Sequence, residues 1–104
     1  MMLLLIAAAA AAPISLSSVT GGVIATECAK DQGLRLDACV SYILGVADTL
    51  QLEHKTCRPG SDAATLQTVT IARRYLSDHP EKWGEHPAFL IRAALVQAFP
   101  CRPR

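Results

Sequence analysis

The sequence predicts an all-α fold, a small up-and-down bundle of three main helices preceded by a short N-terminal helix and stapled by two disulfides. Apolar residues recur at three- and four-residue steps in three segments, and no segment alternates as a half-buried strand would. Proline or glycine separates the segments. The 104-residue chain suffices for one small domain, whose core gives marginal stability by itself. Its four cysteines can supply covalent support.

The N-terminal 18 residues have the composition of a signal peptide. They carry no charged side chain, and residues 3–12 form an apolar run too short to span a bilayer comfortably. An uncleaved anchor is the alternative. We favour export, which divides the chain into a leader over 1–18 and a helical domain over 19–104 with no membrane contact after cleavage. Four cysteines in an exported chain indicate an oxidising compartment, for which the bacterial periplasm is the natural candidate.

The first half of this domain holds a weak helix and a strong one. The short apolar piece at 22–28 precedes a polar loop, after which Asp37 can cap the next helix. That helix is expected to stop within 57–62, where Pro59 and Gly60 are poor helix formers. Its apolar stripe comprises Cys39, Tyr42, Ile43, Val46 and Leu50.

The second half holds two further helices separated by a loop. Ser61 or Asp62 can cap a helix over 63–77, and Pro87 suits the first position of a helix that ends before Pro100. Because this last helix is apolar nearly all round, we expect it at the centre of the bundle. In the loop, a single turn is expected between Pro80 and Gly84, with Glu81 near free amides. The stripe of the 63–77 helix comprises Leu66, Val69, Ala72 and Leu76, with Arg73 and Arg74 beside it.

Topology predicts how the cysteines pair. Cys39 and Cys57 would lie about 25 Å apart along a continuous helix, too far for a bridge between them. Short connections make successive helices antiparallel neighbours. This arrangement brings Cys57 and Cys101 to one end of the bundle and Cys28 and Cys39 to the other. We therefore predict the pairs Cys28–Cys39 and Cys57–Cys101.

Charge and residue spacing argue against several classes of function. Ten basic and nine acidic residues give a net charge of +1, which is unlike the strongly basic face of a nucleic-acid-binding protein. His54, His79 and His86 have no compact metal-ligand spacing, so we expect no metal or other cofactor. An enzyme is disfavoured because paired cysteines leave no free thiol for a nucleophile.

Asp48 has two interpretations, and so does the group formed by Ser41, Tyr42 and Gly45. A mid-helix aspartate is locally unfavourable, so Asp48 either pairs with Arg73 or Arg92 or stays solvated. Tyr42 and Gly45, together with Ser41, either form a close helix contact or belong to ordinary core packing.

Two exposed loops are the candidate partner-binding regions. Trp83 lies in a polar loop beside Glu85, where it either folds back over the bundle or projects toward a partner, as interface aromatics do. The other loop carries His54, Lys55 and Arg58 and is held by the predicted Cys57 bridge, which would reduce the entropy lost on docking.

Four stretches, CVSYILGVAD, CRPG, YLSDHPE and AALVQAFPC, lie in order along the domain. Together they resemble the Rap/Tai family of immunity proteins against type VI secretion amidase effectors. Ser41 departs from the family, which often has glycine there, but serine is also small. The family pattern falls on Cys39, Tyr42, Gly45, Val46, Asp48, Cys57, Pro59, Tyr75, Leu76, His79, Pro80, Glu81, Ala98, Phe99, Pro100 and Cys101.

The resemblance implies a non-enzymatic periplasmic protein that binds a papain-like peptidoglycan amidase and blocks its active-site cleft. Members of that family are often dimeric, so the resemblance also allows a homodimer. Many relatives have no identified effector, which leaves an orphan binding module as one alternative. A periplasmic holdase chaperone is the other: three histidines can respond to mild acid, although two cross-links would resist the opening that such a chaperone needs.

Overall fold

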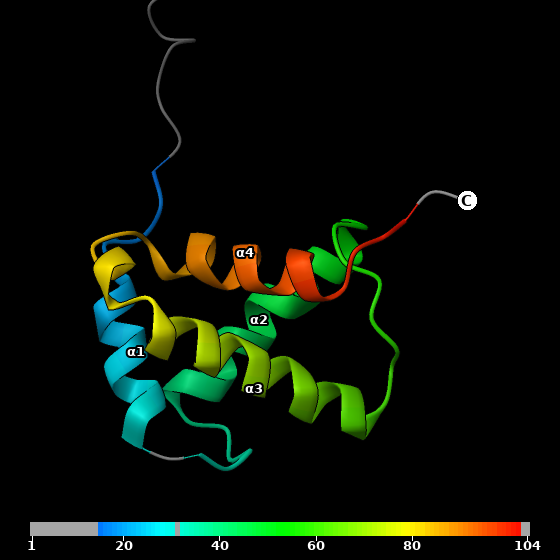
Figure 1. Cartoon of the computed structure of the whole chain (residues 1–104), viewed down its shortest axis with the longest axis horizontal. Coiled ribbons are helices and arrows are strands. Elements are labelled where there is room, and N and C mark those ends of the chain that lie inside the picture. The colour runs from blue at the N-terminus through cyan, green and yellow to red at the C-terminus, as the bar shows by residue number, and fades with distance from the viewer. Residues whose placement is uncertain (1–14, 31, 103–104) are drawn as a thin grey trace, which may run out of the picture.

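The computed structural model describes residues 15–30 and 32–102, and this part of the chain contains helices and no strand (Figure 1). None of its helices has the length and apolar character needed to cross a membrane. The apolar run at 3–12, on which the signal-peptide prediction depends, lies outside the described residues. The helices are α1 (Gly21–Lys30), α2 (Ala38–Leu52), α3 (Asp62–Asp78), the 3-10 turn η2 (Pro80–Lys82) and α4 (Pro87–Ala98).

The main helices run alternately in opposite directions, which confirms the all-α bundle. Figure 1 shows α3 and α4 side by side and antiparallel, with α2 behind them and α1 at one end. Each of the four α-helices contacts the other three. Their apolar faces meet in one core, whose almost fully buried aliphatic side chains are Val40, Ile43, Val69, Leu76, Ile91 and Leu95.

The predicted helix starts are confirmed by their hydrogen bonds. Val40 N–H donates to Asp37 Oδ1 at 2.9 Å, and Ala64 N–H donates to Ser61 Oγ at 3.1 Å. Each bond satisfies an amide that has no partner within its own helix. Pro87 occupies the first turn of α4, where its missing N–H costs nothing. Local sequence therefore determines where α2, α3 and α4 begin.

Both predicted disulfides are present. Cys28–Cys39 joins α1 to the first turn of α2, and Cys57–Cys101 joins the loop after α2 to the segment after α4. Figure 1 shows the end of α1 and the start of α2 at one end of the bundle, and the loop after α2 and the segment after α4 at the other. The up-and-down topology thus explains both pairings.

Two packing predictions are wrong. The α4 helix has an exposed side instead of a central position: Phe89 is 53% exposed, and Arg92 and Gln97 are also exposed. Leu66 is 48% exposed because it lies at the edge of the buried stripe of α3. Thr68 is buried in that helix instead, and its hydroxyl donates to the Ala64 carbonyl at 2.7 Å.

The N-terminus of α1 is held by the loop after η2. Gly21 N–H donates to the Glu85 carbonyl at 2.7 Å, and Gly22 N–H donates to the Trp83 carbonyl at 3.0 Å. This approach leaves no room at Gly21, where an added Cβ would lie 2.6 Å from Leu90 Cδ1 and 3.1 Å from the Glu85 carbonyl oxygen. At Gly22 the nearest atom to an added Cβ is Trp83 Cβ at 3.5 Å, an ordinary contact distance.

Gly21→Ala is expected to lower the free energy of unfolding by about 1–3 kcal/mol, because the new methyl group pushes both the buried Leu90 side chain and the Glu85 backbone away from α1. Gly22→Ala is the matched control and should change it by less than about 0.5 kcal/mol. Urea denaturation followed by circular dichroism measures both. Equal effects of the two substitutions would show that the close contact of Gly21 with Leu90 and Glu85 does not determine which residue is tolerated at this position.

Candidate protein-binding surface

The structure separates the two loops that the sequence proposes for partner binding. His54, Lys55 and Arg58 follow α2, whereas Trp83 and Glu85 follow η2. Figure 1 shows the first loop in green at one end of the bundle and the second in yellow and orange at the other. These five side chains do not form one site.

The loop after α2 begins with a turn that sequence reasoning missed. The helix ends at Leu52, before Pro59 and Gly60, where it was expected to stop. Lys55 N–H donates to the Leu50 carbonyl at 2.8 Å, and His54 N–H donates to the Gln51 carbonyl at 3.1 Å. This pair of bonds defines a Schellman motif, which needs one left-handed residue. His54 takes that place with φ of 58°.

His54→Gly is expected to raise the free energy of unfolding by about 0.5–1 kcal/mol, because glycine adopts the left-handed conformation without a steric penalty. The melting temperature should rise by about 3–6 °C. The control is Glu53→Gly, whose φ is −90° and which should give no such gain. A lower melting temperature for His54→Gly would mean that the imidazole itself stabilises this turn.

Further contacts make the rest of this loop rigid. The Gln51 side-chain oxygen accepts from the Thr56 hydroxyl at 3.1 Å and from Arg58 N–H at 3.3 Å. Cys57 N–H donates to the Phe99 carbonyl at 2.9 Å beside the disulfide to Cys101. The loop is therefore tied both to α2 and to the end of α4.

Asp48 forms an ion pair, but with a different partner from those predicted. Its Oδ1 lies 2.9 Å from Nη2 of Arg58, and neither Arg73 nor Arg92 is involved. The Arg58 side chain is only 11% exposed, whereas that of Asp48 is 70% exposed. The exposed carboxylate thus compensates a largely buried cation and joins the middle of α2 to the loop.

Trp83 folds back on the bundle, as one of its two interpretations predicts. Its indole Nε1–H donates to the Leu76 carbonyl at 2.8 Å, and the ring is partly buried against the core. The carbonyls of Trp83 and Glu85 accept from the first amides of α1. The observed contacts of this loop are thus structural, and its role in partner binding stays a prediction.

An apolar groove lies between α2 and α4, with a volume of about 430 Å³. Tyr42, Gly45 and Val46 line it from α2, and Phe89 and Arg92 line it from α4. Burial raises the pKa of the Tyr42 phenol above 10.0. Gly45 is exposed, and an added Cβ there would meet no atom within 4 Å, so in the described structure this residue takes part neither in a close helix contact nor in core packing, the two interpretations of the sequence. The small residues of α2 line an open surface instead.

A second hollow of about 460 Å³ continues this groove toward the loop after α2. It shares Phe89 and Arg92 with the groove and adds Lys55. We call the combined region the α2–α4 surface, defined by Tyr42, Gly45, Val46, Lys55, Phe89 and Arg92. It joins one sequence-predicted partner-binding residue, Lys55, to three family-pattern positions on α2, namely Tyr42, Gly45 and Val46.

Phe89 and Arg92 were not among the predicted binding residues, although the sequence contained a signal for them. They stand three residues apart in a helix, so they share one face. Arg92 marks that face as solvent-exposed, because an unpaired arginine is rarely buried. An aromatic side chain on the same face is a typical interface residue.

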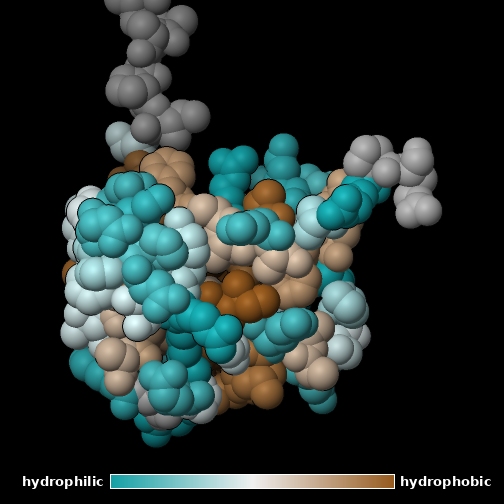
Figure 2. Space-filling view, viewed as in Figure 1, coloured by the Kyte–Doolittle hydropathy of each residue, from teal (hydrophilic) through white to brown (hydrophobic). Residues whose placement is uncertain are grey.

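The face formed by α3 and α4 is less suited to a continuous apolar contact. Figure 2 shows apolar side chains there as separate areas among hydrophilic ones. Arg74, Asp78 and His79 line the hollow between these two helices together with Ile71 and Ala94. The α2–α4 surface is therefore the stronger candidate for binding a protein.

The described residues contain no group of three or more histidine, cysteine, aspartate or glutamate side chains placed to hold a metal ion. All four cysteines are disulfide-bonded. What the α2–α4 surface offers is an exposed aromatic ring, two cations and an aliphatic floor. Its aromatic ring and its arginine are residue types that are enriched in protein interfaces.

The Rap1a immunity protein model matches residues 20–101, most of the chain. The chain belongs to the Rap1a immunity protein family. This confirms the resemblance seen in the sequence. No curated protein and no solved structure matches the chain.

Several family-pattern positions of this Rap1a-family chain have structural roles. Pro80 starts η2 with Glu81 in its first turn, as predicted. The His79 ring stacks on Tyr75 with centroids 4.0 Å apart, and its Nδ1–H donates to the Tyr75 carbonyl at 2.8 Å. Pro100 follows the last helical turn of α4, where it cannot continue the helix. Tyr42 and Gly45 differ from these because they line the open α2–α4 surface.

Proposed function

We propose that this protein is a periplasmic immunity protein that binds a type VI secretion peptidoglycan amidase and inhibits it sterically. Membership of the Rap1a immunity protein family carries the proposal. The two disulfides support an oxidising compartment, since such bonds persist mainly in exported proteins. The uncharged leader at 1–18 supports the same location.

The α2–α4 surface is our candidate for the contact with the amidase. Phe89 supplies an aromatic anchor at its centre, and Arg92 and Lys55 supply charge beside it. Phe89 and Arg92 lie on α4, and Lys55 lies in the loop that the Cys57–Cys101 disulfide ties to the end of α4, so little conformational entropy is lost on binding. A folded surface that occupies a substrate cleft inhibits without any catalytic residue, and we propose that the protein is not an enzyme.

Export would enlarge this surface. Leu16 lines the groove together with the α2 and α4 residues and is itself exposed. Cleavage near residue 18 would remove Leu16 and uncover the part of the groove that it contacts. The mature protein would then present more of this apolar floor to a partner, whether an amidase or a second copy in a homodimer.

The proposal is tested by native co-purification from the producing cell. The full-length chain carries a C-terminal affinity tag, is exported, and is captured from the periplasmic fraction at neutral pH. We expect one stoichiometric partner, identified by mass spectrometry as a papain-like peptidoglycan amidase. Capture of many unrelated proteins, and only after acidification, would contradict the proposal and favour a holdase.

A further inference from the structure

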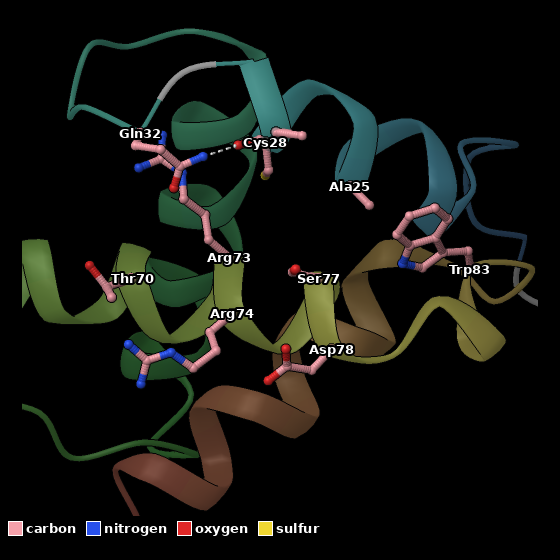
Figure 3. Close-up of a pocket in the computed structure, with 10 residues that line it drawn as sticks. Ala25, Cys28, Gln32, Thr70, Arg73, Arg74, Ser77, Asp78 and Trp83 are labelled. Carbon is pink, nitrogen blue, oxygen red and sulfur yellow. Dashed lines mark hydrogen bonds between the residues drawn. The ribbon is translucent and has the colours of Figure 1, made fainter.

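A pocket between α1 and α3 is not explained by the proposed function. It has a volume of about 450 Å³ and shares no lining residue with the α2–α4 surface. Cys28 and Ala25 line it from α1, Arg73 and Arg74 line it from α3, and Trp83 closes one end (Figure 3).

Arg73 is the unusual residue of this pocket. It is 8% exposed, and its side chain points from α3 toward the C-terminal end of α1 (Figure 3). Its Nε and Nη2 atoms are buried and have no hydrogen-bond partner among the described residues. Buried charges in proteins are normally paired, because an uncompensated one is strongly destabilising. The guanidinium group therefore lacks a partner that its environment requires.

The two unpartnered nitrogens indicate the chemistry of that partner. Nε–H and Nη2–H lie on one edge of the planar guanidinium group and point in the same direction. This edge matches the two oxygens of a carboxylate, which accept two parallel hydrogen bonds. The charged lining residues are two arginines and one aspartate, Asp78, which gives a net charge of +1. A singly charged anion fits this balance better than a doubly charged phosphate.

Gln32 covers the same end of the pocket. Its side-chain Nε2–H donates to the Cys28 carbonyl at 3.0 Å, and Figure 3 shows its amide at the end toward which Arg73 points. Gln32 is exposed and lies outside the helices, so it can move without disturbing the core. A ligand that displaces this amide would reach the guanidinium edge, with the hydroxyls of Thr70 and Ser77 along the remaining wall.

We propose that the α1–α3 pocket binds a carboxylate group through Nε–H and Nη2–H of Arg73. The carboxylate is either the terminal group of a small acid or peptide or the side chain of an acidic residue in a protein. Both sources present the same two oxygens. The site is independent of the amidase proposal, because it uses a different part of the molecule.

The most direct test observes the Arg73 Nε–H resonance by ¹H–¹⁵N NMR. The signal is assigned by its loss in Arg73→Lys, and sodium acetate is titrated against sodium chloride at constant ionic strength. We expect a saturable shift with acetate and a much smaller one with inorganic phosphate. No saturable shift, or an equal response to phosphate, would overturn the proposal.

Thermal denaturation provides a second readout. Acetate at about ten times its dissociation constant should raise the melting temperature by about 5–10 °C. Arg73→Met should abolish this rise without lowering the melting temperature in acetate-free buffer, because it removes an uncompensated charge. Arg92→Met, which removes an exposed charge elsewhere, should keep the full acetate effect. An undiminished acetate effect in the folded Arg73→Met variant would overturn the proposal. If Arg73→Met does not fold, the wild-type NMR titration still decides.

Two peptides distinguish the sources of the carboxylate. Acetyl-Gly-Gly with a free C-terminus presents a terminal carboxylate, and amidated acetyl-Gly-Glu-Gly presents only a side-chain carboxylate. Each is titrated against the acetate-bound protein while the Arg73 Nε–H signal is followed. Displacement of acetate supports the site, and the tighter peptide identifies the source. Failure of both peptides to displace acetate would support the site with a small acid as its ligand and would exclude peptide and protein carboxylates as the source.

Discussion

Replacing Cys57 and Cys101 together by alanine is expected to lower the free energy of unfolding by about 4 kcal/mol. The bond closes a loop of 44 residues, and the chain-entropy model assigns a stabilisation of this size to such a loop. Cys57 is exposed and Cys101 is only partly buried, so the substitutions leave little cavity and the loss reflects mainly the cross-link. For a small domain this loss approaches the whole net stability.

Urea denaturation of the oxidised wild type and the double variant measures this loss. The control is reduction of the variant with dithiothreitol, which then breaks only Cys28–Cys39 and should remove about 3 kcal/mol more. A double variant as stable as the wild type would show that the hydrogen bonds of Gln51 and Cys57 hold the loop without the covalent bond.

On the proposed function, Phe89→Asp is expected to weaken binding of the amidase by about 100-fold. The substitution places a charge in the apolar centre of the α2–α4 surface, where truncation of an aromatic anchor typically has effects of this size. Because Phe89 is 53% exposed, the melting temperature should change by only a few degrees. Binding is measured by isothermal titration calorimetry with the co-purified amidase.

Leu66→Asp is the matched control for Phe89→Asp. Leu66 is 48% exposed, so the two sites differ little in exposure, but it lies on α3 outside the α2–α4 surface. We expect the affinity of the Leu66→Asp variant for the amidase to stay within about threefold of that of the wild type. Equal losses for both variants, or an effect of Leu66→Asp alone, would place the amidase contact elsewhere.

Local signals in the sequence predicted most of the fold. The caps at Asp37 and Ser61 and the proline at 87 act through bonds to neighbouring residues, so their effect is visible in the sequence itself. The disulfide pairing followed from helix order alone, because short connections permit few arrangements. These features do not depend on details of side-chain packing.

The features that the sequence did not predict depend on tertiary contacts. His54 ends α2 in a conformation that usually belongs to glycine, so no composition signal marks it. Asp48 pairs with Arg58 because the loop folds back along α2, whereas helical periodicity alone suggested arginines on other helices. The exposure of Phe89 depends on how α4 is rotated in the bundle, which periodicity fixes poorly in a strongly apolar helix. Leu66 is exposed because it lies at the edge of the buried stripe of α3, a position that the spacing of apolar residues does not distinguish from the centre of the stripe.

The rate of peptidoglycan hydrolysis by the co-purified amidase tests the inhibitory role most directly. With one equivalent of the wild-type protein, we predict that hydrolysis falls to the background rate, because the bound protein occupies the substrate cleft. Phe89→Asp at the same concentration should leave most of the activity. A stoichiometric complex that hydrolyses peptidoglycan at the rate of the free enzyme would contradict steric inhibition.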